Sequence, residues 1–132
     1  MLEISFEIIC KMLKKAELPE CQLVVGIADA GVVPASLVAC LLNRDLRIIK
    51  SQYRDENNVP CFPEPVIKNT VTVTPDINTI LLVDDVSISG KTLNAAREMF
   101  KEYTVKTFVF RGKADFVLFP ELDECVHWPW RV

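Results

Sequence analysis

The segment ILLVDDVSISGKT, residues 80–92, changes from apolar to acidic to small polar residues over a short stretch of chain. Its apolar start predicts a buried strand, which ends in two adjacent carboxylates, Asp84 and Asp85. A loop of hydroxyl residues with one glycine, Gly90, follows, and a helical pattern begins after it. The unpaired N–H groups of a helix start attract anions, and glycine lets the backbone approach them closely. The segment therefore predicts a site with one end for a phosphate and the other for hydroxyl groups, as a ribose 5-phosphate needs.

Strand-like and helical patterns alternate along the rest of the chain. Apolar residues at helical spacing predict helices over residues 2–17, 32–43 and 91–103. Short apolar runs predict strands over residues 23–28, 46–49, 71–73, 79–83 and 104–110. This alternation is typical of an α/β fold with a central, mainly parallel sheet flanked by helices. The length of 132 residues fits one domain over residues 1–132.

Composition narrows the class of partner. The net charge is −3 without a long run of one sign, whereas nucleic-acid binding usually needs a basic face, so we expect no nucleic-acid partner. No apolar run reaches the roughly 18 residues of a membrane span, and the N-terminus lacks the basic start of a signal peptide. Five cysteines without a C-x-x-C pair are typical of free thiols in the cytosol. We therefore expect a cytoplasmic protein with no membrane partner.

Three other interpretations of residues 80–92 are open. A Walker P-loop would need a glycine where Asp85 stands. A receiver domain would need a phosphoacceptor strand and a lysine strand after the two aspartates, and too little chain follows them. A purely structural strand–turn–helix does not need two adjacent acidic residues. Each of these fits the segment less well than a ribose phosphate site does.

The same segment resembles the phosphoribosyl pyrophosphate motif of the type I phosphoribosyltransferases, and every defined position of that motif is met. The resemblance implies that Asp84 and Asp85 are catalytic residues that bind the ribose 2′ and 3′ hydroxyls. It also implies that Asp84 holds Mg²⁺, directly or through water. The 5′-phosphate would lie in the loop formed by Val86, Ser87, Ile88, Ser89, Gly90, Lys91 and Thr92.

The resemblance extends over nearly the whole chain and is greatest to the xanthine/hypoxanthine/guanine branch. VVGIADAGVVPASLVACLLNRDL, residues 24–46, is similar to the first strand, pyrophosphate loop and helix of that branch. The pyrophosphate loop would then consist of Ala28, Asp29, Ala30 and Gly31. Ser51-Gln52-Tyr53 resembles the start of the mobile catalytic loop, here residues 52–69, with Tyr53 as a catalytic residue.

The C-terminal part resembles the family's base-binding region. Lys113 would hydrogen-bond the 6-oxo group of a purine, and a hood over residues 111–132 would bring Val126 and Trp128 against the base. The resemblance thus implies a phosphoribosyltransferase, which is a pentosyltransferase. Its partners would be phosphoribosyl pyrophosphate, a nitrogenous base that is most simply a purine, Mg²⁺, and the products nucleoside 5′-monophosphate and pyrophosphate. We also expect a homodimer.

Two positions depart from the purine-using pattern. Asp29 stands where many members carry Arg or Lys, and a carboxylate beside pyrophosphate is repulsive unless it helps to organise magnesium. Ile88 stands where members that use 6-oxopurines usually carry an Asp facing N7 of the purine. These departures leave a second hypothesis open, a catalytically weak module that binds phosphoribosyl pyrophosphate or a nucleotide.

Overall fold

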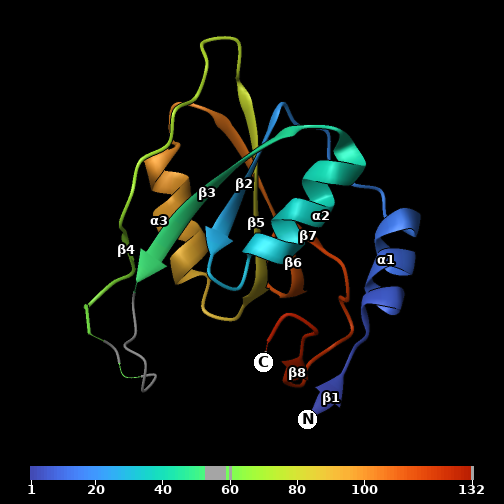
Figure 1. Cartoon of the computed structure of the whole chain (residues 1–132). Helices are drawn as coiled ribbons and strands as arrows, with labels where there is room; N and C mark the ends of the chain where they lie inside the picture. The colour runs from blue at the N-terminus through green and yellow to red at the C-terminus, as the bar shows by residue number, and fades with distance from the viewer. Residues whose placement is uncertain (53–58, 60, 132) are drawn as a thin grey trace.

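The main sheet of the molecule has the strand order β4-β3-β2-β5-β6-β7 (Figure 1). The computed structural model describes residues 1–52, 59 and 61–131. Neighbouring strands from β3 to β7 pair in parallel, and β4 pairs antiparallel with β3. The strands are β2 (Leu23–Ala28), β3 (Asp45–Gln52), β4 (Val66–Ile67), β5 (Thr79–Ser87), β6 (Thr104–Gly112) and β7 (Phe116–Val117). The predicted α/β fold with a mainly parallel sheet is therefore confirmed.

Helices cover both faces of this sheet. The helices are α1 (Phe6–Lys15), α2 (Val32–Leu42) and α3 (Lys91–Met99). Helices α1 and α2 lie over one face and α3 lies over the other (Figure 1). Two apolar clusters follow from this, one containing Leu13 and Val38, the other containing Leu93 and Phe100. Residues 23–28 of β2 and 80–83 of β5 are covered on both faces, as expected for their nearly continuous apolar sequences.

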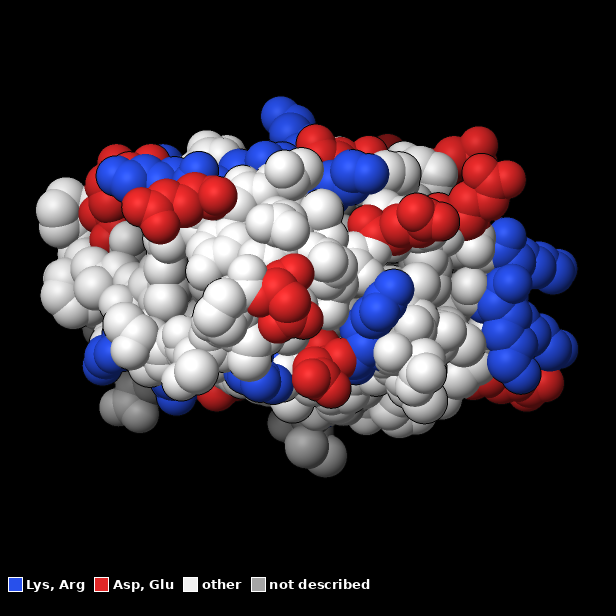
Figure 2. Space-filling model, turned by 90° about the horizontal axis from the view of Figure 1, so that it is seen from above, with Lys and Arg blue, Asp and Glu red and all other residues white. Residues whose placement is uncertain are grey.

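The carboxyl ends of the parallel strands meet at one edge of the sheet, the lower edge in Figure 1. A two-stranded parallel sheet of β1 (Leu2–Glu3) and β8 (Val126–His127) lies at this end, as do both chain termini. The opposite end, seen from above in Figure 2, carries acidic and basic side chains side by side. Within the part of the chain that the structure describes, no helix has the length and apolar character of a membrane span.

The first helix is shorter than the predicted span of residues 2–17. It begins at Phe6 because Ser5 caps it: the Ser5 Oγ accepts the N–H of Ile8 at 3.3 Å. Leu2, which the helical spacing had included, belongs to β1 instead. The apolar period continued across the cap, and periodicity alone does not detect such a boundary.

The predicted strand over residues 71–73 is wrong, and a strand forms at Val66–Ile67, inside the predicted loop 52–69. The pairing of β4 with the outer edge of β3 ends after Ile67, where a side chain replaces the backbone ladder. Next to β4, the side-chain amide of Asn69 accepts the N–H of Lys50 at 2.7 Å and donates to the carbonyl of Ile48 at 3.0 Å. A side chain thus satisfies this part of the edge, and Val71 and Val73 pack on the apolar cluster without pairing.

Candidate functional site

Two buried carboxylates lie near the carboxyl end of β5. Asp84 is 8 % exposed and Asp85 is 4 % exposed. Asp84 Oδ1 accepts the N–H of Asp85 at 2.8 Å, and Asp85 Oδ1 accepts the N–H of Val86 at 2.7 Å. These backbone donors orient both side chains, and each carboxylate keeps further lone pairs for other partners.

The negative charge of Asp85 affects the ionisation of Asp84. Burial raises the pKa of Asp84 well above its usual value, and the negative charge of Asp85 raises it further, while the charge of Arg131 acts in the opposite direction. A carboxyl group with a raised pKa ionises more readily when a cation or hydrogen-bond donors lie beside it. The pair is therefore suited to a ligand that brings hydroxyl groups or a metal ion.

The loop between β5 and α3 encloses a small cavity of about 70 Å³. Gly90 caps α3 with a positive φ of 80°, a backbone conformation that favours glycine. The cavity is lined by Asp84, Val86, Ser87, Ile88, Ser89, Gly90, Thr92 and Leu93. Its small volume and its position at a helix start suit a compact anion such as a phosphate group.

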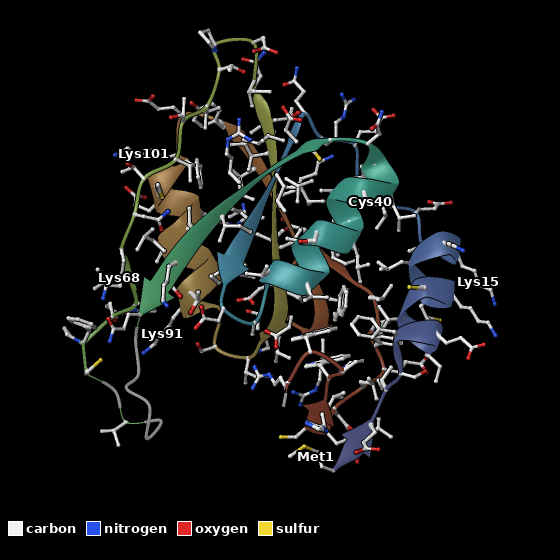
Figure 3. All side chains as sticks on the ribbon, viewed as in Figure 1. Met1, Lys15, Cys40, Lys68, Lys91 and Lys101 are labelled. Carbon is white, nitrogen blue, oxygen red and sulfur yellow. The ribbon has the colours of Figure 1, made fainter. Side chains whose placement is uncertain are left out.

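Helix α3 follows this loop; it begins at Lys91 and ends at Met99, shortly before Lys101. Lys91 lies at the carboxyl end of the sheet, and Lys101 lies at the far end of α3 (Figure 3). The N–H of Lys91 donates to Ser89 Oγ at 3.3 Å, which holds the loop against the helix start. The neighbouring Ile88 is 59 % exposed, so an apolar side chain faces solvent beside the cavity.

The loop between β2 and α2 lies directly against the acidic pair. Gly31 makes this approach possible, because a Cβ there would stand 2.4 Å from the carbonyl oxygen of Ile27 and 3.0 Å from Asp84 Oδ1. Any larger residue would push residues 28–31 away from Asp84. The structure thus brings together two segments that are far apart in the sequence.

Asp29 in this loop has a basic partner on the neighbouring strand. Lys50 Nζ lies 3.4 Å from Asp29 Oδ1, and both side chains are more than half exposed. The parallel register that pairs Ala28 with Lys50 brings the lysine to the loop. A positive charge is therefore present at this loop although the loop itself carries none.

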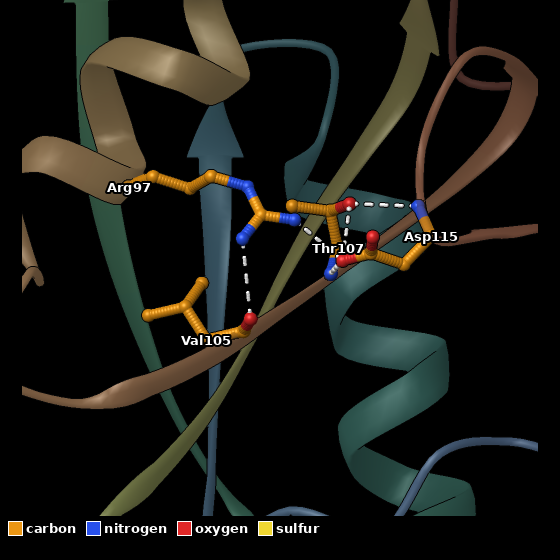
Figure 4. Close-up of polar contacts among 4 residues, drawn as sticks. All are labelled: Arg97, Val105, Thr107 and Asp115. Carbon is orange, nitrogen blue, oxygen red and sulfur yellow. Dashed lines mark hydrogen bonds and ion pairs between the residues drawn. The ribbon is translucent and has the colours of Figure 1, made fainter.

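A polar network holds the segment that follows β6 (Figure 4). The Asp115 carboxylate accepts hydrogen bonds from the Thr107 N–H at 2.9 Å and the Thr107 hydroxyl at 3.1 Å, and it pairs with Arg97 of α3. The Asp115 N–H donates back to Thr107 Oγ1 at 2.9 Å. Burial alone would raise the pKa of Asp115, but the Thr107 N–H and the Arg97 charge outweigh it, so this pKa lies below its usual value.

Lys113 lies in the same segment, directly after β6. Its N–H donates to the carbonyl of Ser87 at 2.7 Å, which joins the end of β6 to the end of β5. The exposed Lys113 side chain therefore starts beside the loop that encloses the small cavity. Lys113, Ser89 and Gly90 also line a second, more open cavity of about 280 Å³.

An aromatic cluster anchors the C-terminal segment. Trp128 and Trp130 stack with ring centroids 5.4 Å apart and planes 3° apart, and Phe110 meets both rings edge-on. Trp128 is 1 % exposed, whereas Trp130 is partly exposed. Trp128 is therefore a core residue, whereas part of the Trp130 side chain faces solvent.

A family model described as the phosphoribosyl transferase domain matches residues 9–113. The chain belongs to this family. It is a phosphoribosyltransferase, an enzyme of the pentosyltransferase class. No curated protein sequence matches the chain significantly.

Solved structures with the same fold include other phosphoribosyltransferases. The purine phosphoribosyltransferase of Pyrococcus horikoshii Ot3 is 21 % identical with a TM-score of 0.74, over 98 % of this chain and 92 % of that chain. The xanthine-guanine-hypoxanthine phosphoribosyltransferase of Helicobacter pylori is 16 % identical with a TM-score of 0.79, over 99 % and 94 %. A hypothetical protein of Neisseria gonorrhoeae with bound ppGpp is 19 % identical with a TM-score of 0.70, over 99 % and 90 %.

Most of the site residues predicted for this phosphoribosyltransferase lie at the same edge of the sheet. The acidic pair, the loop 86–92, the loop 28–31 and Lys113 all follow or end strands there. Val126 lies in β8 and is partly buried, and Trp128 is buried in the core. Tyr53 lies outside the described residues.

Three residues near the candidate site carried no sequence signal. Lys50 reaches Asp29 only through strand register, and Asp115 reaches Thr107 only because the chain folds back after β6. Arg131 reaches Asp85 from the C-terminal segment, with Nη2 and Oδ2 3.0 Å apart. The motif defined Asp85 but not its partner, since the two residues are far apart in the sequence.

Proposed function

We propose that this enzyme transfers the 5-phosphoribosyl group from phosphoribosyl pyrophosphate to a purine base, yielding a nucleoside 5′-monophosphate and pyrophosphate. One observation carries the proposal. Asp84 lines the small cavity of the loop 86–92 and also lies within contact distance of Gly31. A phosphate pocket, a pair of carboxylates and a second loop therefore surround one point, as a substrate with a phosphate, a diol and a pyrophosphate requires.

In this arrangement each part of the substrate has a partner. The 5′-phosphate would occupy the cavity, where Ser87, Ser89 and Thr92 offer hydroxyl donors. Asp84 and Asp85 would accept hydrogen bonds from the ribose hydroxyls, and residues 28–31 would lie along the pyrophosphate. The bond from C1′ to pyrophosphate would lengthen first, so that positive charge develops on the ribose ring. The base nitrogen would then bond to C1′ and release its proton to solvent, while pyrophosphate leaves with the electron pair of the broken bond.

The chain's own contribution would be positioning and charge stabilisation. The buried carboxylates near the ribose would favour the positive charge that develops there. Lys113 would orient a purine through its 6-oxo group, with Val126 and the Trp128–Trp130 cluster on the apolar side. Tyr53, from the segment 52–69, is proposed to complete the site and help exclude water.

Magnesium fits the acidic pair only together with substrate. Among the described residues no group of three or more His, Cys, Asp or Glu side chains could hold a metal ion. Mg²⁺ is commonly bound through one or two carboxylates plus phosphate and water oxygens, which matches Asp84 and Asp85 beside a pyrophosphate. When bound, the ion would neutralise part of the leaving group's charge. We propose Asp84 as the ligand, directly or through water.

Support for a purine comes from two sides. Two structures with the same fold, from P. horikoshii and H. pylori, are described as purine and xanthine-guanine-hypoxanthine enzymes. Lys113 follows β6 beside the loop 86–92, a position from which a lysine would reach a base bonded to C1′. Ile88 offers no proton exchange with N7, so a purine would rely on Lys113 for orientation.

A steady-state screen tests the proposal. Xanthine, hypoxanthine, guanine, adenine, uracil and orotate would each be mixed with the protein, phosphoribosyl pyrophosphate and Mg²⁺. We expect turnover with at least one purine, no turnover without Mg²⁺, and loss of turnover in the double variant D84N/D85N. Turnover with orotate or uracil, and with none of the purines, would contradict the proposal that the substrate base is a purine.

A second candidate is a catalytically weak module that binds phosphoribosyl pyrophosphate or a nucleotide. The exposed Ile88 beside the cavity and the acidic Asp29 in the loop 28–31 favour it. The similar N. gonorrhoeae structure, which is described with bound ppGpp, is a nucleotide complex of the same fold. Calorimetry showing tight nucleotide binding without turnover of any base would favour this candidate over the transferase.

The proposal includes a single-domain, cytoplasmic homodimer. Helix α2, with the sequence VVPASLVACLL, has no charged side chain, and its Leu41 is 45 % exposed. A helix that is apolar on all sides is usually covered by other protein. Sedimentation equilibrium tests the assembly, because a single species near 14.9 kDa would reject the dimer.

A further inference from the structure

The C-terminal Arg131 makes direct contact with the acidic pair. Its Nη2 donates to Asp85 Oδ2 at 3.0 Å, and the other Asp85 oxygen already accepts the N–H of Val86. Both carboxylate oxygens of Asp85 are therefore engaged. The Asp85 side chain is 5 % exposed, whereas the Arg131 side chain is 55 % exposed.

The backbone of Arg131 is held while its side chain remains accessible. Its N–H donates to the carbonyl of Trp128 at 3.1 Å, and the preceding Trp130 stacks on Trp128. The guanidinium can therefore leave Asp85 by side-chain rotation, without unpacking the aromatic cluster. Asp85 cannot leave with it, because it is buried in β5.

We propose that Arg131 is a displaceable counter-ion of Asp85, and that it makes the site select sugars whose hydroxyl groups can replace it. This inference rests on the proposed function, in which Asp84 and Asp85 bind the ribose hydroxyls. In the free protein Arg131 compensates a buried negative charge. A ribose with both hydroxyls replaces the guanidinium with its own donors, whereas a ring without hydroxyls leaves the ion pair in place.

This competition has a measurable consequence. Removing the guanidinium leaves Asp85 buried without its cation, which raises the free energy of the free protein relative to the ribose complex. The variant R131Q should therefore bind ribose 5-phosphate more tightly than the wild type does. It should bind the phosphate of a ring without hydroxyls with unchanged affinity.

Calorimetry with two probes tests the inference. The probes are ribose 5-phosphate and tetrahydrofurfuryl phosphate, which keeps the ring and the phosphate and lacks the hydroxyl groups. The proteins are the wild type, R131Q, R131K and R44Q. Arg44 is an exposed arginine at the amino end of β3, so R44Q makes the same change in charge away from the site. Circular dichroism would check that each variant is folded.

We expect R131Q to bind ribose 5-phosphate about twofold to fivefold more tightly than the wild type, as for one partly exposed ion pair. Its affinity for tetrahydrofurfuryl phosphate should change less than about twofold. R131K and R44Q should remain close to the wild type with both probes. Weaker binding of ribose 5-phosphate by R131Q would overturn the inference, because Arg131 would then be a ligand-binding residue.

The remaining outcomes separate the inference from the function on which it rests. Wild-type binding of ribose 5-phosphate without any gain in R131Q overturns the inference and leaves the proposed function standing. An equal gain for both probes also overturns it, because a general electrostatic effect would then be acting. No binding of ribose 5-phosphate by any of the four proteins overturns the proposed function and the inference with it.

Discussion

At Asp84, the proposed role in binding conflicts with the stability of the fold. Burial and the neighbouring Asp85 disfavour its ionised form, yet a ligand with hydroxyl donors or a metal ion needs that charge. The folded-state pKa is raised above the unfolded value. The contribution of Asp84 to stability is therefore fully present below the unfolded pKa and is lost as the pH rises through the folded pKa.

The substitution D84N tests this conflict. The amide can still accept the N–H of Asp85 and never ionises, so we expect a higher free energy of unfolding than the wild type at pH 8. The difference should shrink as the pH falls toward the usual range for aspartate. Binding of ribose 5-phosphate should weaken about tenfold or more, the loss of a charge-assisted hydrogen bond. Urea denaturation at several pH values measures the stability, and calorimetry measures the affinity. A D84N variant less stable than the wild type at pH 8 would contradict the expectation.

Asp29 and Lys50 form a second residue pair whose charges should offset each other. In D29N the lysine loses its partner and the loop 28–31 loses a negative charge, so pyrophosphate should bind about twofold to fivefold more tightly. Adding K50Q should remove the gain. Competition binding at fixed Mg²⁺ measures this, and weaker pyrophosphate binding in D29N would instead indicate that Asp29 organises magnesium.

At the scale of elements, the end of β6 is held by the Asp115 network. Thr107, Arg97 and Asp115 connect β6, α3 and the segment before β7. Lys113 lies within that segment and donates its N–H to Ser87 of β5. The network therefore positions a proposed base-binding residue relative to the loop 86–92.

The substitution D115N should lower the free energy of unfolding by about 1–2 kcal/mol at neutral pH. This is the energy of hydrogen bonds to a charged group, reduced because the Asp115 side chain is partly exposed. The pKa of Asp115 is lowered in the folded state, so its contribution is present above the unfolded pKa and is lost as the pH falls through the folded pKa. D115N and wild type should therefore converge in acid. Thermal denaturation from pH 7 down into the acid range measures this, and a gap that does not narrow as the pH falls below the usual pKa of aspartate would contradict it.

At the scale of the whole molecule, the C-terminal segment closes one apolar cluster and also reaches the site. Trp128 belongs to the cluster on the α1 and α2 side of the sheet, and Arg131 three residues later contacts Asp85. Packing of the last residues thus sets the surroundings of the acidic pair. Truncation of this end would affect both stability and binding.

The substitution W128A should lower the free energy of unfolding by about 3–5 kcal/mol, the typical cost of removing a large buried aromatic side chain. W130A should cost less, because Trp130 is only partly buried. Chemical denaturation compares the two variants. An equal or larger loss in W130A would contradict the assignment of Trp128 as the core residue.

The local sequence determined the fold class and the phosphoribosyl motif. Apolar runs over residues 23–28 and 79–83 indicated buried parallel strands. The acidic pair and the small polar loop of the motif follow the second run within one short segment. Hydrophobic period and turn chemistry depend on near neighbours, so the sequence displays them directly. The same reasoning failed at residues 71–73, where Val71 and Val73 pack on the apolar cluster without pairing as a strand.

Only the tertiary structure decided which residues complete the site. Lys50 meets Asp29 through the register of β2 and β3, Gly31 meets Asp84 through the packing of two loops, and Arg131 meets Asp85 across 46 positions. Trp128 and Trp130 have the same chemistry, and packing alone makes one a core residue and leaves the other accessible. Such pairings depend on how separate elements are placed in space, and that placement follows from the packing of the whole chain.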